Sequence, residues 1–395
     1  MKKILSFIIL ISVLFCGCSS GQKTEIKGEM QGVAKTGVWI SFSEINLMLK
    51  SENGFENEVI KSAENCSELG IENVYIHIRS YCDSLFKSLY FPLISSAESY
   101  SADAFEFMVR TYHKYNIKVH AWINPYRVLT SSSDINMLST ESPAFKWLND
   151  SDTQNDMNVC ISNGIYLNPA SQEVQKLVID GIREVMALYD IDGIHFDDYF
   201  YPTTNAEFDK KSYEQYIKNN EKPMDLSDWR RANVNTLISS CYSAIKSCDK
   251  DIIFSISPAA SVENNYNSLY ADAREWVKNG YIDAVIPQIY FGFEYPLEEY
   301  RFETLLREWE EIAKLNTNVS LLIGLAPYKI GTDIEADKDE WQSENDILAR
   351  QAKLCYDSAW AGGFVLFSHT ALFLDEELNT KQRENLKDFL EQIQE

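Results

Sequence analysis

The sequence predicts a (β/α)8 barrel, an α/β fold of the TIM-barrel type with long loops after its strands. Short β-rich runs alternate with longer helical stretches over residues 36–395, and eight such units are enough to close one barrel. Several strands follow a helix-stop signal, as at Gly70, Gly280, Gly362 and Gly363. No G-x-G-x-x-G turn follows the first strand, which disfavours an open doubly wound sheet.

The strands are predicted from runs rich in β-branched and aromatic residues. In chain order they are Thr36–Phe42, Asn73–Arg79, Ile117–Asn124, Gly193–Asp198, Asp251–Ser257, Asp283–Tyr290, Val319–Leu325 and Gly363–His369. The helices are expected at Glu56–Leu69, Ser101–Tyr115, Ser171–Tyr189, Ser227–Ser247, Ser268–Asn279, Leu297–Leu315, Asp339–Ala361 and, at the end, Asn379–Gln394. Because βα loops carry the active site of such barrels, the long ones should be functional. These are Tyr81–Tyr100, Pro125–Ala170, Tyr199–Leu226 and Pro327–Lys338.

The first 35 residues predict export rather than a folded element. Lys2 and Lys3 precede a short apolar stretch, and small residues surround Cys18. This pattern resembles a bacterial lipoprotein signal, residues 1–17, with cleavage after Gly17 and a lipid on Cys18. Residues 18–35 are polar and aperiodic, so they are expected to be a flexible tether. The expected location is the cell envelope, with lipid anchoring to a bacterial membrane.

Composition narrows the classes of partner. The formal net charge of −23 disfavours nucleic acid and anionic membrane surfaces, so we expect membrane contact through the lipid alone. Aromatic residues make up 13% of the chain, which suits the flat faces of sugar rings. Large cores are also aromatic, so the composition by itself shows only that a neutral ligand such as a glycan is easier to accommodate than an anionic one. No C-x-x-C pair is present, and no metal or other cofactor is expected.

Side-chain alternation predicts which strand residues face the barrel axis. In five strands one parity is apolar and suits the layer beneath the helices, whereas the other carries polar groups. The polar set should therefore converge inside the barrel, near the carboxyl ends of the strands. It comprises Tyr75, His77 and Arg79; His120, Trp122 and Asn124; His195 and Asp197; Ser255 and Ser257; and Gln288 and Tyr290.

The stretch DGIHFDDYFYP, residues 192–202, carries two adjacent carboxylates at a strand end. Parity points Asp197 into the barrel mouth above His195, so the chemistry is assigned first to Asp197. Asp198 begins the following loop and is either a second reactive acid or a loop cap. Glycoside hydrolysis usually needs two carboxyl groups. Glu294 and Glu263 are the alternative second acids, and each is otherwise a solvated loop residue.

Aromatic and polar residues near the same mouth would bind sugar. Trp122, Tyr126, Tyr199 and Tyr290 are candidate stacking platforms, and Asn124, Arg127 and Gln288 are candidate partners for hydroxyl groups. Three interior histidines and Asp197 could instead ligate zinc or manganese. The first strand has no H-x-H, however, so these histidines are interpreted as a hydrogen-bonded layer that supports the carboxylate.

These motifs resemble the family-10 glycosyl-hydrolase-like proteins, also called DUF187, which include bacterial envelope lipoproteins. The resemblance runs through GVWISF (37–42), IRSYCDSLFKS (78–88), HAWINPYRV (120–128), LNPASQEVQ (167–175), YDIDGIHFDDYFYP (189–202), DWRRANVN (228–235), ISPAAS (256–261) and IDAVIPQIY (282–290). It implies a (β/α)8 glycosidase fold, and some members are similar to enzymes that cut peptidoglycan strands stripped of peptide. By motif it implies an acidic pair, Asp197 and Asp198, with His195 beside them, and a pocket that includes Arg79, Asp83, Asn124, Tyr126, Arg127, Gln288 and Tyr290.

Two departures qualify that resemblance. Asn168 stands where the common motif is acidic, and ISPAAS lacks the glycine and aromatic residues often found after the fifth strand. The strand also resembles DGIDIDWEYP of family-18 chitinases, but Tyr199 replaces their proton-donating Glu. We therefore expect a glycoside hydrolase that acts on a β-linked amino-sugar glycan, such as peptide-free peptidoglycan. The alternatives are a non-catalytic glycan-binding lipoprotein and a metal-dependent hydrolase.

Overall fold

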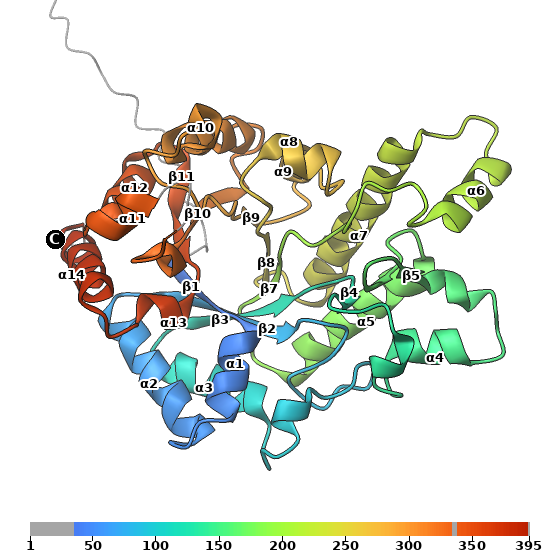
Figure 1. Cartoon of the computed structure of the whole chain (residues 1–395), viewed down its shortest axis with the longest axis horizontal. Helices are drawn as coiled ribbons and strands as arrows, with labels where there is room; N and C mark the ends of the chain where they lie inside the picture. Colours follow the sequence, from blue (N-terminus) through green and yellow to red (C-terminus); the bar gives the residue numbers. More distant parts are fainter. Residues whose placement is uncertain (1–34, 334–337, 394–395) are drawn as a thin grey trace, which may run out of the picture.

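The computed structural model describes residues 35–333 and 338–393. Eight parallel strands close into a barrel in the order β1-β11-β10-β9-β8-β7-β3-β2, and helices surround them (Figure 1). The predicted (β/α)8 fold is confirmed. The predicted signal (1–17), Cys18 and the tether up to residue 34 lie outside the described residues.

The barrel strands lie close to their predicted positions. They are β1 (Thr36–Ile40), β2 (Asn73–Arg79), β3 (Lys118–Ile123), β7 (Gly193–Phe196), β8 (Ile253–Ile256), β9 (Ala284–Val285), β10 (Ser320–Leu325) and β11 (Ala361–Leu366). The prediction was too long at β9, which was expected to reach Tyr290. Pro287 has no backbone N–H for a ladder, and beyond it Gln288 makes only isolated bridges to Ala259 and Gly324.

Long helices cover the outside of the barrel, and shorter ones lie in the loops. The long helices are α2 (Phe55–Glu68), α3 (Ala104–Lys114), α5 (Gln172–Leu188), α7 (Leu226–Cys248), α10 (Phe302–Ala313), α12 (Ile347–Asp357) and α14 (Glu377–Gln392). The shorter ones are α1 (Phe42–Leu49), α4 (Pro143–Asn149), α6 (Lys210–Asn219), α8 (Val262–Asn267), α9 (Ala273–Asn279), α11 (Lys338–Ser343) and α13 (His369–Leu372).

Several helix predictions were wrong in detail: α4, α6, α8 and α13 were not predicted, and the helix expected at Ser268–Asn279 begins only at Ala273. The stretch predicted as one helix, Asp339–Ala361, is two helices, α11 and α12, and the chain is not helical from Glu344 to Asp346. Helix α1 was not predicted, although the sequence carries its signal. The Ser41 side chain accepts from the backbone of Glu44, and the Glu44 carboxylate accepts from the backbone of Ser41, forming a capping box.

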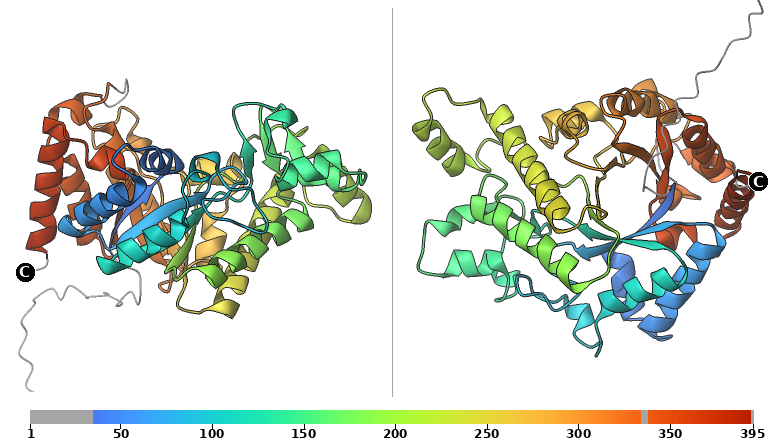
Figure 2. Two further views of the ribbon diagram at one scale, coloured as in Figure 1. Left: turned by 90° about the horizontal axis from the view of Figure 1, so that it is seen from below. Right: turned by 180° about the vertical axis from the view of Figure 1, so that it is seen from behind.

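The loop predicted at Pro125–Ala170 has structure of its own. It contains a three-stranded antiparallel sheet in the order β4 (Arg127–Leu129), β6 (Ile165–Leu167), β5 (Val159–Ile161). Helix α6, in the next long loop, joins this unit through Asn168, whose amide donates to the Ser212 hydroxyl. The unit projects from one side of the barrel (Figures 1 and 2). Two of the predicted long loops therefore form one wall of the barrel mouth.

Two buried layers hold the barrel. The larger one lies between strands and helices, and the smaller one fills the axis with Trp39, Tyr75, Trp122, Ile286 and Leu322 among its members. This interior layer supports the barrel mouth from below. None of the helices in the described residues is long and apolar enough to cross a membrane.

Candidate active site at the barrel mouth

Asp197 lies directly after β7 and is almost fully buried, with 2% of its surface exposed. Its Oδ2 accepts from Trp122 Nε1 at 3.2 Å and from Asn124 Nδ2 at 3.1 Å. Its Oδ1 accepts from the backbone N–H of Tyr199 at 3.3 Å. Three donors from two strand ends therefore fix this carboxyl group, as preorganised catalytic groups require.

Burial shapes the charge of the acidic pair. Burial first, and then the neighbouring Asp198 carboxyl, raise the pKa of Asp197 to about 7, although Arg127 and the donors act to lower it. Burial also raises the pKa of Asp198 to about 6, although Gln288 donates a hydrogen bond to that carboxyl. Two adjacent carboxyls in a poorly solvated site resist being ionised together. Near neutral pH the pair can therefore hold one proton.

Arg127 is the cation of this site. Its guanidinium lies over the ring of Tyr81 at 4.6 Å and over the ring of Tyr199 at 4.3 Å. Its Nη2 donates to the Tyr81 hydroxyl at 2.8 Å. The same charge lowers the pKa of both Asp197 and Asp198. Arg127 therefore links an exposed aromatic ring, Tyr199, to the acidic pair.

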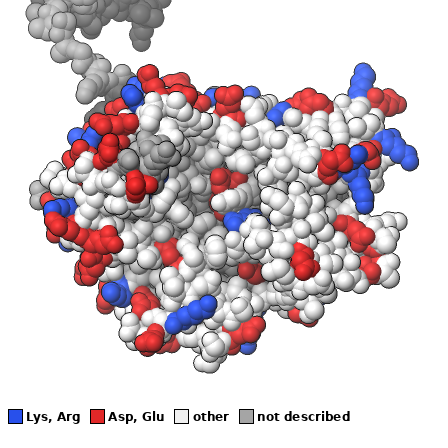
Figure 3. All heavy atoms as spheres, viewed as in Figure 1, with Lys and Arg blue, Asp and Glu red and all other residues white. Residues whose placement is uncertain are grey.

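Asp197 borders a cleft of about 380 Å³ whose walls come from the ends of all eight barrel strands or the loops after them. The walls are mostly aromatic and uncharged. Tyr290 stacks on Phe367 with 5.7 Å between ring centroids, and Tyr328 meets both rings edge-on. Figure 3 shows a hollow near the middle of the Figure 1 face, where acidic and basic atoms lie side by side. The cleft is lined by Trp39, Ser41, Phe42, Ser43, His77, Trp122, Arg127, Asp197, Tyr199, Ser257, Gln288, Tyr290, Tyr328 and Phe367.

His195 lies beneath the cleft and is fully buried. Its Nε2 must be unprotonated, because the indole N–H of Trp39, which can only donate, lies 3.0 Å from it. Nδ1 therefore carries the proton and donates to Ser255 Oγ at 2.8 Å. Burial lowers the pKa of His195 and keeps it neutral. His195 thus belongs to a hydrogen-bonded support, not to the wall that contacts substrate.

The other interior histidines have different neighbours. His120 Nε2 bonds Asn73 Oδ1 at 3.0 Å, and His77 stacks flat on Trp122 with 3.8 Å between ring centroids. In the part of the chain that the structure describes, no three His, Cys, Asp or Glu side chains are grouped so that they could hold a metal ion. The geometry therefore offers no support for the metal-dependent alternative.

Arg79 corrects the parity prediction. It was expected to face the barrel axis, but its guanidinium lies 3.7 Å from the ring of Phe91, and a Cβ at Gly181 of α5 would touch it. Arg79 is therefore packed between strand and helix. The cause is a register shift between His77 and Arg79 in the β2–β3 ladder, which turns the Arg79 side chain to the opposite face of the strand.

Six further predicted residues do not line the cleft, among them Asp198, which follows Asp197 in the chain, and Asn124, which donates to Asp197. Tyr126 is buried in the outer core. Asp83 closes a turn, because its Oδ1 accepts from the backbone N–H groups of Ser80 and Tyr81 at 3.0 Å each. Glu294 is exposed and Glu263 lies in the first turn of α8, beside a separate hollow. Neither glutamate is placed to act with Asp197.

Several cleft residues were missed in the sequence. Phe42, Tyr81, Ser257, Tyr328 and Phe367 surround the acidic pair or contact Arg127. Ser257 was on the predicted inward parity, and Tyr328 was in a predicted long loop, so both carried a signal. Tyr81 opened another predicted long loop, Tyr81–Tyr100, and so carried the same signal as Tyr328. Phe42 was expected as the last residue of the first strand, but it is the first residue of α1.

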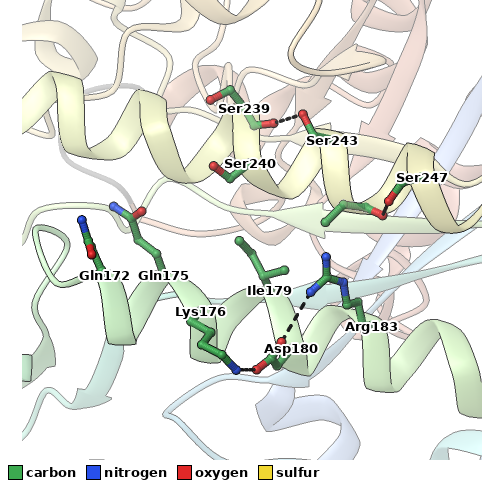
Figure 4. A pocket seen from close by; sticks show the side chains of 11 residues that line it. Gln172, Gln175, Lys176, Ile179, Asp180, Arg183, Ser239, Ser240, Ser243 and Ser247 are labelled. Carbon is green, nitrogen blue, oxygen red and sulfur yellow. Dashed lines mark hydrogen bonds and ion pairs between the residues drawn. The ribbon is translucent and has the colours of Figure 1, made fainter.

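A larger hollow, of about 640 Å³, lies on the outside of the barrel between α5 and α7 (Figure 4). None of the predicted site residues lines it. Its charged side chains satisfy each other, since Asp180 pairs with both Lys176 and Arg183. Three of its serines donate to backbone carbonyls of α7. We therefore place the functional site at the smaller cleft.

Comparisons with known proteins identify the family of the chain. The family model described as glycosyl hydrolase-like 10 matches residues 35–343. The chain is 33% identical over 348 residues to glycosyl hydrolase YngK of Bacillus subtilis (strain 168), covering 80% of this chain and 66% of that protein. It is 26% identical over 435 residues to glycosyl hydrolase DigH of Escherichia coli (strain K12), covering 98% and 95%.

Solved structures share the fold at low sequence identity. The glycoside hydrolase domain of PgaB from Bordetella bronchiseptica has a TM-score of 0.60 at 13% identity, covering 89% of this chain and 98% of that domain. Alpha-L-fucosidase isoenzyme 2 from Paenibacillus thiaminolyticus has a TM-score of 0.54 at 12% identity, covering 90% and 49%. With the family model matching most of its length, the chain belongs to the glycosyl hydrolase-like 10 family.

Proposed function

We propose that this protein is a glycoside hydrolase of the cell envelope that cleaves a β-linked amino-sugar glycan, such as peptide-free peptidoglycan strands. The observation that carries the proposal is Asp197, whose carboxyl three donors fix in the wall of an aromatic cleft, with Asp198 next to it in the chain. Membership of the family and the fold shared with the PgaB glycoside hydrolase domain support the reaction class. The resemblance of the motifs to glycan-strand hydrolases supports the substrate.

Asp197 and Asp198 take different roles. Burial by itself favours a proton on Asp197, whose pKa is raised more than that of Asp198. The hydrogen bonds favour the opposite placement, because three donors point at Asp197 and stabilise its ionised form. In the free enzyme burial outweighs the donors, because the pKa of Asp197 stays near 7 although three donors point at it. With substrate bound, we place the shared proton on Asp198, beside the glycosidic oxygen, and the fixed donors hold Asp197 ionised.

The chemical step then follows from this placement. Asp198, half-buried beside Gln288, gives its proton to the oxygen of the glycosidic bond as the C–O bond breaks. The Asp197 carboxylate faces the positive charge that develops at the anomeric carbon, and acts there as nucleophile or as base for water. Arg127 limits the rise in pKa of both acids and leaves each free to ionise in turn.

The test is release of new reducing ends from peptide-free glycan strands by the full-length chain. Asp197→Asn and Asp198→Asn should each lower the rate by about 10²–10⁴-fold, the typical contribution of such groups. Glu294→Gln and Glu263→Gln are matched controls, because both are carboxylates outside the cleft, and they should keep wild-type rates. Wild-type cleavage by a folded Asp197→Asn variant would refute the role of Asp197.

The same experiment separates the non-catalytic alternative. A glycan-binding protein would bind the oligosaccharide without releasing reducing ends, and its binding would survive Asp198→Asn. The envelope location has its own test. Cys18→Ala should move the protein from the membrane fraction to the soluble fraction of cells, and a variant that stays membrane-bound would refute the lipid anchor.

A further inference from the structure

Arg127 is a cation without an acidic partner in the wall of the cleft beside Asp197. It is the only lysine or arginine among the described residues that line this cleft. Its guanidinium forms no ion pair with any described residue, and its one side-chain hydrogen bond runs from Nη2 to the Tyr81 hydroxyl at 2.8 Å. A guanidinium carries five N–H donors, so most of the donors of Arg127 are left for a ligand.

Two tyrosine rings hold the guanidinium and leave part of its edge open. The Tyr81 ring lies 4.6 Å from it and the Tyr199 ring 4.3 Å. Because the rings contact a planar group, further ligands bind to its N–H edge. Nε is buried and has no hydrogen-bond partner within the described residues, whereas Nη1, which has none either, is not buried. Nη1 is therefore the donor through which Arg127 can bind a ligand in the cleft.

The charges around Arg127 allow an anion to bind there. Asp197 and Asp198 feel its charge, since it lowers the pKa of both, but neither carboxylate comes within 4.0 Å of it. Near neutral pH the acidic pair can hold one proton, so Arg127 offsets the single negative charge that remains. The net charge of −23 acts from further away, and salt screens it over about 8 Å at physiological ionic strength. The acidity of the whole chain therefore does not decide which ligand Arg127 accepts.

A carboxylate is the ligand group that this arrangement fits best. A hydrogen bond from a guanidinium to a carboxylate is roughly twice as strong as one between neutral groups. A sugar hydroxyl would also accept from Nη1, but it would leave the positive charge without a counter-charge in a partly buried place. A phosphate carries nearly two negative charges and would meet one cation beside two acids. One carboxylate matches one guanidinium in both charge and hydrogen bonding.

We propose that Arg127 binds a carboxylate carried by the glycan next to the bond that is cleaved. The substrate class is then an acidic glycan with a free carboxyl on one of its sugar units. This specificity deepens the proposed function, on which it rests. In peptidoglycan the peptide is joined to such a carboxyl as an amide, which removes the charge, so peptide-bearing strands lose the contact and peptide-free strands make it.

The experiment measures binding with two ligands that differ only in this charge. One is the peptide-free tetrasaccharide of alternating N-acetylglucosamine and N-acetylmuramic acid, and the other is the same tetrasaccharide with its carboxyls converted to primary amides. The protein is the full-length Asp198→Asn variant, which keeps one negative charge on the acidic pair, as the wild type does near neutral pH. Calorimetry should show at least about tenfold tighter binding of the carboxylate form. That preference should fall as salt is added.

Variants assign the preference to Arg127. Arg127→Gln on the same background should reduce it to about twofold or less and change binding of the amide form by less than about threefold. Arg183→Gln is the matched control, because it removes the same charge from α5 at the outer hollow, and it should keep the full preference. The thermal midpoint of each variant checks its fold.

Equal binding of the two ligands, tighter binding of the amide form, or no binding of either would overturn the inference. So would a preference that survives Arg127→Gln, or a loss of both ligands by the same factor, because Arg127 would then only support the cleft wall. The two proposals fail separately. A wild-type protein that prefers the carboxylate form but releases no reducing ends would refute the hydrolase and keep the Arg127 contact. Equal kcat/KM on the two forms would refute the contact and keep the hydrolase.

Discussion

Asp197 should lower the free energy of unfolding at neutral pH, and its replacement by Asn should raise that free energy again. The side chain is buried and its pKa rises from an ordinary 3.8 to about 7. Each pKa unit corresponds to about 1.4 kcal/mol, so the rise corresponds to stabilisation on the order of 4 kcal/mol below pH 4 that is absent above pH 7. Asn resembles the protonated acid in shape and charge, and it also removes the repulsion from Asp198.

The sign of this effect follows from the proton count. Because the folded state binds the Asp197 proton more tightly than the unfolded state, stability is lost as pH rises from 3.8 towards 7. Asp197→Asn should therefore unfold at higher urea than wild type at pH 8, by up to a few kcal/mol, and match it near pH 4. The assay is urea unfolding followed by tryptophan fluorescence at pH 4, 6 and 8.

A surface carboxylate provides the control. Asp388 is exposed on α14, so Asp388→Asn should change stability little at any of these pH values. Our reasoning about burial would be refuted if Asp197→Asn were less stable than wild type at pH 8, or if its advantage were larger at pH 4. Either result would mean that the three donors stabilise the folded carboxylate more than burial destabilises it.

Three further changes test individual contacts. Trp122→Phe removes a donor that lowers the pKa of Asp197, so the acid limb of kcat/KM against pH should move up by about one to two pH units. Arg127→Gln removes the positive charge that lowers the pKa of both acids, so both limbs of that profile should move to higher pH. Asp209→Asn leaves Arg230 buried without its partner at 2.5 Å and should cost about 3–5 kcal/mol in urea unfolding.

Each of these changes has its own control and its own contrary outcome. Trp39→Phe also removes an indole N–H, but from His195, so it should leave the acid limb in place whatever it does to the rate. An acid limb that moves down in Trp122→Phe would contradict our assignment of an ionised Asp197. An Arg127→Gln profile that does not shift would mean that Arg127 only supports Tyr199. Loss of less than about 1 kcal/mol in Asp209→Asn would show that the buried pair is dispensable.

Alternation of strand and helix signals was enough to predict the barrel. Each strand and helix must bury its apolar face against another element, and few folds allow this. Eight strand–helix repeats predict one of them, the (β/α)8 barrel. The ends of the individual strands and helices were harder to predict. Strand β9 stopped early because Pro287 ends its ladder, and α1 was overlooked although Ser41 and Glu44 carry its capping box. The small sheet β4-β6-β5 was not predicted, because a strand of three residues is too short to show an alternating pattern of polar and apolar residues.

The site was predictable where side-chain direction depends only on strand geometry. Asp197, Trp122 and Asn124 meet as their parity requires. Parity was wrong for Arg79, because a register shift that no residue type announces reversed its direction. Loop residues such as Glu294 could not be placed at all. Their positions depend on contacts made by distant parts of the chain, including the bond from the Glu294 backbone to the Glu340 carboxylate.

The sequence by itself therefore determined the fold class and the strand end that carries the acidic pair, because both follow from local periodicity. The tertiary structure decided which groups surround that pair. Only closure of the barrel brings Arg127 between two tyrosines and leaves Glu263 and Glu294 outside the cleft. Burial, which only the assembled fold creates, sets the charges on which the proposed chemistry depends.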